Sequence, residues 1–258
     1  MCVYFFAINV NPRFPVIVAG NRDEFLERGS KAAHFWPSPP DMLAGRDERD
    51  GGTWLGVNRK GRWALLTNFR DPSSVRADRP SRGGLVTDFL CGEKPPEEWL
   101  LCVEKEAAQY NPFNLVAASG ADIFWFSSRL KGVRRIGDSV HGLSNALLDT
   151  PWPKVMRGCA AMRETAPEII GPERLEPLFD MLADTETAPD DKLPDTGVGL
   201  DFERILSSVF VKSPVYGTRC STVLLIDHKG VLTFSERTYN NCGPGNFTGA
   251  AFSFRTRI

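Results

Sequence analysis

Strand-like and helix-like segments occur in separate blocks along this chain, and their order is the strongest constraint on its fold. Residues 2–9 and 15–21 are apolar, β-branched or aromatic and flank a turn at 11–14, a pattern that predicts an N-terminal hairpin. A second hairpin is predicted over 53–68, and four short strands over 114–145. The chain therefore begins with strands and returns to strands near its middle.

Helical patterns separate these strand blocks, and a last hairpin is predicted over 221–236. Five helices are predicted, over 83–91, 96–109, 154–165, 172–183 and 201–208. Segregated blocks of strands and helices favour an α+β fold with mainly antiparallel sheets over a doubly wound parallel sheet. Two such sheets, packed face to face with helices outside, would form four layers.

The size and charge of the chain limit its organisation and its partners. Its 258 residues are predicted to form one domain over 1–258, with a flexible surface excursion at the acidic, Pro-rich and Gly-rich stretch 184–199. The 31 Lys and Arg residues balance 32 Asp and Glu residues, so no overall basic field would attract nucleic acid. The apolar runs are too short to span a membrane, and no basic segment precedes the first one, which predicts a cytosolic protein.

The six cysteines are widely spaced and form no C-x-x-C pair or Cys–His cluster, so neither a disulfide framework nor a metal site is expected. Cys2 is the one cysteine that is a candidate for a catalytic role. Loss of Met1, expected before a small second residue, would give Cys2 both a thiol and a free α-amino group. Their ordinary pKa values, about 8.5 and about 8, lie near neutrality, so modest nearby charge would produce a thiolate. A nucleophile activated by its own amine is an established arrangement.

A polar tetrad closes the second strand of the first hairpin. Asn21 to Glu24 are four consecutive polar or charged residues, which are costly near a core unless they are paired or serve a site. A turn centred between residues 12 and 13 would place Cys2 opposite Asp23, and a slip of one residue would place Arg22 there instead. The alternatives are a solvated strand end for the tetrad and a simple core position for Cys2.

Together these segments resemble the NRDE family, also called the transport and Golgi organisation protein family. The resemblance covers essentially the whole chain. It is carried by Met1-Cys2 and by the motifs N-R-D-E (21–24), G-G-T-W-L-G (51–56), T-N-F-R (67–70), G-L-S-N (142–145) and L-D-T-P-W-P-K-V (148–155). That family is similar, more distantly, to N-terminal nucleophile (Ntn) hydrolases of the choloylglycine hydrolase and penicillin V acylase type. The resemblance implies an αββα sandwich, in agreement with the order of the blocks.

The resemblance also implies the residues of a catalytic site. Cys2 matches the acylase nucleophile, Arg22 and Asp23 its Arg and Asp pair, and Asn68 an asparagine at the edge of the site. Asn145 resembles the asparagine whose amide helps to hold the oxyanion. A late arginine of the acylase site corresponds to Arg219. Acylases space their Arg and Asp two residues apart, whereas here the two are adjacent and would point to opposite faces of a strand.

Two functions follow from the resemblance. The first is a cysteine amidohydrolase that acts on an amide or ester of a small hydrophobic or amphipathic substrate and needs no cofactor. The second is a non-catalytic carrier on the same fold, because members of the family have been linked to haem trafficking and to lipid and acyl-CoA metabolism. Haem would then be a carried ligand, with His34, His141 or a thiolate as candidate axial ligands.

Overall fold

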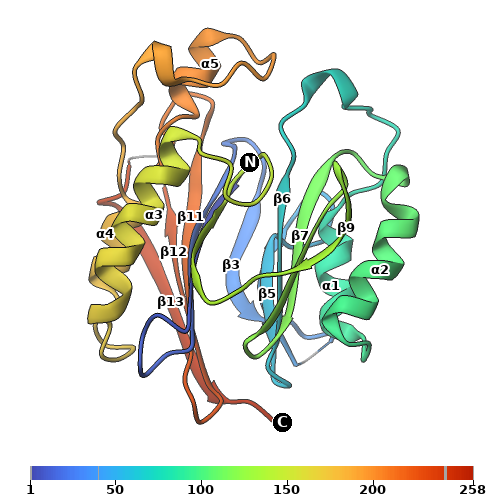
Figure 1. Cartoon of the computed structure of the whole chain (residues 1–258), viewed down its shortest axis with the longest axis vertical. Coiled ribbons are helices and arrows are strands. Elements are labelled where there is room, and N and C mark those ends of the chain that lie inside the picture. Colours follow the sequence, from blue (N-terminus) through green and yellow to red (C-terminus); the bar gives the residue numbers. More distant parts are fainter. Residues whose placement is uncertain (1, 40, 241–242, 258) are drawn as a thin grey trace.

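The computed structural model describes residues 2–39, 41–240 and 243–257. Removal of Met1 and the pairing state of Cys242 concern residues outside the described part. The described residues form two antiparallel sheets that pack face to face, with helices on both outer faces (Figure 1). The expected α+β fold, a four-layer αββα sandwich, is confirmed.

Each sheet is antiparallel throughout the described residues. The first sheet has six strands, in the order β10 (Ser139–Leu143), β1 (Cys2–Ile8), β2 (Val16–Phe25), β11 (Tyr216–Ile226), β12 (Val231–Tyr239) and β13 (Phe247–Arg255). The second sheet has seven, in the order β3 (Ser30–Phe35), β4 (Met42–Asp47), β5 (Leu55–Asn58), β6 (Arg62–Asn68), β7 (Phe113–Ser119), β8 (Asp122–Ser127) and β9 (Leu130–Arg135).

The helices lie close to their predicted positions. α1 (Gly83–Cys91) and α2 (Pro96–Glu106) pack on the second sheet, whereas α3 (Pro153–Thr165) and α4 (Glu176–Leu182) pack on the first. α5 (Leu200–Ile205) follows the stretch 184–199, which contains one short 3-10 turn (Asp190–Lys192). Further 3-10 turns occur at Pro72–Ser74, Ala107–Gln109 and Ala166–Glu168. In the described part of the chain, no helix has the length and apolar character needed to cross a membrane.

Three apolar layers hold the sandwich together, one between the sheets and one under each pair of helices. The strand β1 contributes to two of them because its side chains alternate. Tyr4 and Phe6 face the second sheet, and Val3 and Phe5 face α3 and α4. Cys2 follows this alternation and belongs to the layer between the sheets.

The predicted register of the first hairpin is wrong by one residue. Cys2 pairs with Arg22 rather than with Asp23. The connection 9–15 contains an odd number of residues, and the side chain of Asn11 organises it by accepting hydrogen bonds from the backbone N–H groups two and three residues later, at 2.7 and 3.0 Å. This turn shifts every cross-strand pair, so Arg22 shares the face of Cys2 and Asp23 takes the opposite face.

Three strands were not predicted from the sequence: β3, β4 and β13. β3 and β13 are edge strands, so each lacks one neighbouring strand and carries many exposed residues. The two edges meet across the sandwich, where Phe35 contacts Phe252 and Phe254 at ring-centroid distances of 5.8 and 5.7 Å. β4 ends in Gly45-Arg46-Asp47, so it lacks the run of apolar or alternating residues that would predict a strand.

Candidate active site

A pocket of about 460 Å³ lies at the end of the sandwich where β1 begins and where β2 and β6 end. Four of the six expected site residues line it: Cys2, Arg22, Asp23 and Asn68. The other two, Asn145 and Arg219, are not among the described lining residues. The structure therefore brings together most of the site that the sequence predicts, although not with equal access to the pocket.

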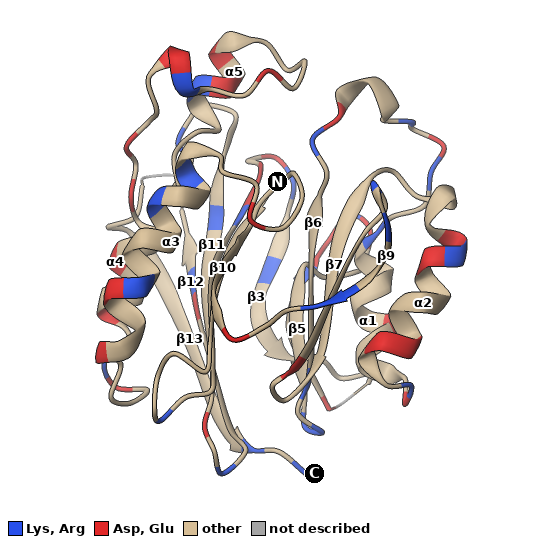
Figure 2. Ribbon diagram, in the orientation of Figure 1, with Lys and Arg blue, Asp and Glu red and all other residues tan. Residues whose placement is uncertain are grey.

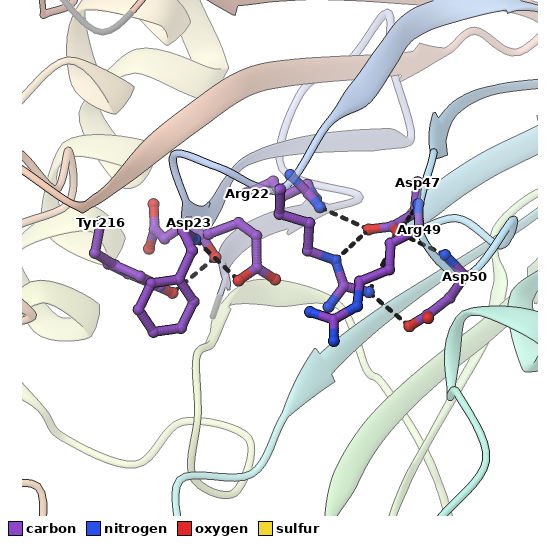
Figure 3. Close-up of polar contacts among 9 residues, drawn as sticks. Arg22, Asp23, Asp47, Arg49, Asp50 and Tyr216 are labelled. Carbon is purple, nitrogen blue, oxygen red and sulfur yellow. Dashed lines mark hydrogen bonds and ion pairs between the residues drawn. The ribbon is translucent and has the colours of Figure 1, made fainter. Parts of the chain in front are cut away.

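Arg22 lies directly beside Cys2 on the face between the sheets. Its other neighbour in the first sheet is Cys220 of β11. The guanidinium stands over the ring of Trp54, 4.3 Å from the centroid, and Nη2 donates a hydrogen bond of 2.9 Å to Oδ2 of Asp47 (Figure 3). These contacts fix a buried cation next to the thiol, and the charge of Arg22 favours the thiolate.

Asp47, at the end of β4, was not predicted as a site residue. It accepts hydrogen bonds from Arg22, from Arg28 Nε at 2.7 Å, and from the backbone N–H groups of Arg49 and Asp50 at 3.1 Å. Burial alone would raise the pKa of Asp47, but the hydrogen bonds and the charges of the two arginines outweigh it and lower the pKa. Asp47 is therefore a fixed anion that orients two arginines of the pocket wall (Figure 3).

Asp23 is fully buried and lies on the opposite face of β2 from Arg22. Its Oδ1 accepts a hydrogen bond of 2.7 Å from Oγ1 of Thr218. Its main-chain carbonyl accepts one of 2.7 Å from the hydroxyl of Tyr216, which Figure 3 shows. Burial raises the pKa of Asp23, while the charge of Lys154 and the hydrogen bond from Thr218 oppose this shift. The carboxyl group is thus held by β11, and the nearby charge of Lys154 favours its ionised form.

Lys154, in the first turn of α3, is the second residue that the sequence reasoning missed. It is 1% exposed, and its Nζ has no hydrogen-bond partner among the described residues. The pKa of Lys154 is lowered from 10.5 to about 8, chiefly by burial and also by the charge of Arg70, while the charges of Asp23, Cys2 and Glu203 oppose the shift. A buried lysine that titrates near neutrality is a common sign of a functional site.

A buried ion pair closes this side of the site. Arg70 Nη1 donates a hydrogen bond of 2.6 Å to Oε2 of Glu203 in α5, and both side chains are almost fully buried. The guanidinium of Arg70 also lies over Trp152, 4.5 Å from the ring centroid. The pair ties the end of β6 to α5 and to the start of α3, so it fixes the helix turn that carries Lys154.

Asn145 is fully buried outside the pocket lining and forms hydrogen bonds with the residues at the end of β6. Its Nδ2 donates a hydrogen bond of 2.9 Å to the main-chain carbonyl of Asn68, and its own carbonyl accepts one of 2.7 Å from the backbone of Arg70. Ser144 Oγ lies 3.1 Å from the carbonyl oxygen of Cys2 and 3.2 Å from Oδ1 of Asn145. The G-L-S-N motif therefore links the start of β1 to the end of β6.

Arg219 lies at a β-bulge of β11, between the residues that pair with Asp23 and Arg22. Its Nη1 donates a hydrogen bond of 3.0 Å to the carbonyl of Leu26, which lies just beyond the end of β2. Burial and the nearby charge of Arg22 lower the pKa of Arg219. Arg219 thus joins the bulge of β11 to the end of β2 and is not among the described residues that line the pocket.

The surroundings of Cys2 act on its thiol in opposite directions. Burial is the largest influence and raises the pKa of Cys2; the charges of Asp23 and Glu24 raise it further, and the charge of Arg22 opposes this shift. The described cysteines are all free, with Cys91 exposed. Burial of Cys2 therefore favours the thiol over the thiolate.

The two histidines considered as haem ligands, His34 and His141, are not among the described residues that line this pocket. His34 Nδ1 is 2.8 Å from the carbonyl of Ala32 on β3, and His141 Nδ1 is 2.7 Å from Oδ2 of Asp149 beside β10. No cluster of three or more His, Cys, Asp or Glu side chains suited to a metal ion occurs in the described ranges.

Two solved structures with a similar fold are named as hydrolysing enzymes. A mutant conjugated bile acid hydrolase from Clostridium perfringens aligns with a TM-score of 0.50 and 10% identity, over 100% of this chain and 97% of that chain. An N-acylethanolamine-hydrolyzing acid amidase ortholog from Caenorhabditis elegans aligns with a TM-score of 0.50 and 11% identity, over 87% and 92% of the two chains. Both are Ntn hydrolases, so the chain has an Ntn-hydrolase-like fold.

Sequence comparison gives the family. Residues 1–241 match the family described as Transport and Golgi organisation 2, and the chain belongs to it. A Transport and Golgi organization protein 2 homolog from Bos taurus is 36% identical over 99% of both chains. The human homolog is 36% identical over 92% of this chain and 93% of its own, and the Drosophila melanogaster protein is 27% identical over 95% and 94%. The resemblance seen in the sequence motifs is confirmed.

Proposed function

We propose that this protein is an amidohydrolase in which Cys2, after removal of Met1, attacks the carbonyl carbon of an acyl amide or ester. The observation that carries the proposal is the position of Cys2 in the pocket wall, paired with Arg22 on one face of the hairpin and next to the buried Asp23 on the other. The names of the two structural neighbours, a conjugated bile acid hydrolase and an N-acylethanolamine-hydrolyzing acid amidase, support C–N bond cleavage.

In the first half of the reaction, the free α-amino group of Cys2 takes the thiol proton as the sulfur attacks the substrate carbonyl. The carbonyl π electrons move to oxygen and give a tetrahedral oxyanion. Its collapse breaks the C–N or C–O bond, and the leaving group receives the proton from the α-ammonium group. The product of this half is a thioester of Cys2. Arg22 stabilises the negative charge that develops on the sulfur.

In the second half, the α-amino group takes a proton from water as that water attacks the thioester. The thiol is restored when the carboxylic acid leaves, so no cofactor is consumed. Asp23 would orient the α-ammonium group through its carboxylate, and Lys154 would keep that carboxylate ionised. Arg22 and Asp23, the buried charged residues on the two faces of β2, thus have separate roles: Arg22 acts on the sulfur and Asp23 on the α-ammonium group.

Asn68 is the better candidate for the oxyanion donor, because it lines the pocket and Asn145 does not. Asn145 would then be a positioning residue, which holds the end of β6 through its hydrogen bond to the carbonyl of Asn68. Loss of one such donor typically lowers the rate by about 10²–10³-fold. Asn68→Ala should therefore lower kcat, and Asn145→Ala should do so through displacement of the β6 end. The apolar part of the substrate would contact Trp54, Leu66 and Val75.

The proposal is tested by hydrolysis of a panel of N-acyl amides and esters by wild type, Cys2→Ala and Cys91→Ala. Cys91 is exposed and lies outside the pocket, so Cys91→Ala is the matched control. We expect Cys2→Ala to lose more than about 10³-fold in kcat/KM and Cys91→Ala to retain the wild-type value. Equal turnover by wild type and Cys2→Ala would overturn the assignment of the nucleophile.

The carrier alternative gives a different result in the same experiment. A carrier would hydrolyse no member of the panel. It would bind haemin or an acyl-CoA equally well as wild type and as Cys2→Ala, since it does not need the thiol. Titration of both ligands against both proteins therefore separates the two functions.

A further inference from the structure

A basic segment lines the pocket, and its arginines have no part in the chemistry described above. Within 75–82 the sequence places an arginine at every third position: Arg76, Arg79 and Arg82. All three line the pocket that contains Cys2. Figure 2 shows charged positions along the loop between β6 and α1, at the same end of the molecule as the start of the chain.

Hydrogen bonds to the neighbouring segment hold this loop in place. Arg79 Nη1 donates to the carbonyl of Ala108 at 2.7 Å, and Arg82 Nη1 donates to the carbonyl of Pro112 at 2.9 Å. Asn111 completes the attachment, because its side chain bonds both the N–H and the carbonyl of Arg76, each at 2.8 Å. The guanidinium groups of Arg79 and Arg82 are thus anchored by neutral carbonyl groups, whereas Arg76 makes an exposed contact of 3.7 Å with Asp78.

The charges of the pocket wall do not balance. Six arginines line it, Arg22, Arg28, Arg49, Arg76, Arg79 and Arg82, against the four carboxylates Asp23, Glu24, Asp47 and Asp50. Asp47 and Asp50 are taken up by Arg22 and Arg28. Among the described residues, Arg49, Arg79 and Arg82 form no ion pair with a carboxylate, so an excess of positive charge remains.

Arg82 brings part of this excess close to the thiol. Burial lowers its pKa, and the neighbouring groups that act on it include Glu24, Arg28, Asp50 and Cys2. A guanidinium stays charged at neutral pH, so its partial burial is costly until an anion approaches it. Gly83, the first residue of α1, lines the same pocket, and the positive end of the helix dipole adds to the field.

We propose that the arginines of 75–82, chiefly Arg79 and Arg82, bind an oxyanion group of the substrate, so that the proposed hydrolase acts on an anionic acyl amide or ester. The inference rests on the proposed function for its reaction, but the binding of the anion does not. Arg is well suited to carboxylate and phosphate because its planar fork donates two parallel hydrogen bonds. The anionic group would lie at the pocket mouth while the acyl carbon reaches Cys2.

Alkylation of Cys2 by two reagents of similar size tests the anion site without turnover. Iodoacetate is anionic and iodoacetamide is neutral, and peptide mass spectrometry gives the rate at each cysteine separately. At pH 7 and low salt, we expect the iodoacetate to iodoacetamide rate ratio at Cys2 to exceed the ratio at exposed Cys91 by about fivefold or more. The ratio should fall towards the Cys91 value in 1 M NaCl.

Two double variants make the test specific. Arg79→Gln/Arg82→Gln should reduce the ratio at Cys2 to that at Cys91, whereas Arg134→Gln/Arg135→Gln removes the same charge from exposed positions of β9 and should leave it unchanged. A ratio at Cys2 no higher than at Cys91, or one insensitive to the first double variant, overturns the anion site. If wild type hydrolyses no amide or ester but its alkylation ratio at Cys2 still exceeds that at Cys91, the proposed reaction is wrong and the anion site stands.

Thermal unfolding gives an independent measurement if Cys2 reacts with neither reagent. Inorganic pyrophosphate or acetate should raise the melting temperature of wild type and of Arg134→Gln/Arg135→Gln, but not of Arg79→Gln/Arg82→Gln. A rise with pyrophosphate alone assigns a phosphate group, and a rise with acetate alone assigns a carboxylate. No rise with either anion contradicts the proposal.

Discussion

At the scale of single residues, the site contains buried charged side chains that differ in their partners. Arg22 has a strong carboxylate partner in Asp47, whereas Lys154 has no hydrogen-bond partner among the described residues. Neither Asp47 nor Lys154 was singled out from the sequence. An aspartate at a strand end and a lysine in a first helical turn are ordinary surface features, and only the tertiary structure shows that they are buried.

The shifted pKa of Lys154 predicts a pH dependence of stability. The unfolded chain holds this proton up to about pH 10.5 and the folded chain releases it at about pH 8, so the folded state gains stability as pH rises between these values. We expect the free energy of unfolding of wild type to rise relative to Lys154→Met by up to about 3 kcal/mol over this range. Urea unfolding at several pH values measures it, with Lys131→Met as an exposed control. Parallel curves for wild type and Lys154→Met would contradict the buried charge.

The lowered pKa of Asp47 predicts a loss of folding stability at acidic pH. Its pKa is lowered in the folded protein, so its stabilisation is complete above about pH 4 and disappears as pH falls through the lower folded value. Asp47→Asn should destabilise the protein at pH 7 by about 3 kcal/mol, since Arg22 is left buried without its partner. The difference from wild type should shrink in acid.

Asp41→Asn provides the matched control, because Asp41 makes only a loose, exposed contact of 3.7 Å with Arg59. A loss of stability that is equal in the two variants, or that persists unchanged at low pH, would mean that Asp47 does not hold the arginines as described.

At the scale of elements, strands with two neighbours and amphipathic helices could be predicted from the sequence, but exact register and edge strands could not. The N-terminal hairpin and the helices follow from apolar periodicity. The pairing of Cys2 with Arg22 instead depends on the turn that Asn11 forms, a local contact that strand periodicity does not report. β3 and β13 were missed because an edge strand needs fewer apolar residues than a central one.

Asn11 should therefore matter more than an ordinary turn residue. Besides organising 9–15, its Nδ2 donates hydrogen bonds of 2.8 Å to the carbonyls of Ala166 and Ile169, which lie next to α3. Asn11→Ala leaves these buried groups without partners, so we expect a loss of about 2–3 kcal/mol in the free energy of unfolding. Urea titration measures it. Gln109→Ala, at an exposed position, should change stability by less than about 0.5 kcal/mol, and a similar value for Asn11→Ala would rule out this role.

At the scale of the whole molecule, the four layers place chemistry from distant parts of the chain at one end of the sandwich. Cys2 comes from the first strand, Lys154 from the third helix, and the arginine segment from the loop between the sheet and α1. The sequence motifs that predicted this family lie at the ends of strands and at the start of α3. The excess positive charge at the pocket mouth was not predicted, since the overall charge of the chain is near zero.

The central claim is that the mature chain begins at Cys2 and that this residue carries the acyl group during the reaction. The most direct measurement is mass spectrometry of the N-terminal peptide, from purified protein mixed with an activated acyl ester and quenched in acid. We predict a peptide that starts at Cys2 and is heavier by the mass of one acyl group, with no such addition in Cys2→Ala. A peptide that retains Met1, or an acyl group found on any other residue, would contradict the account.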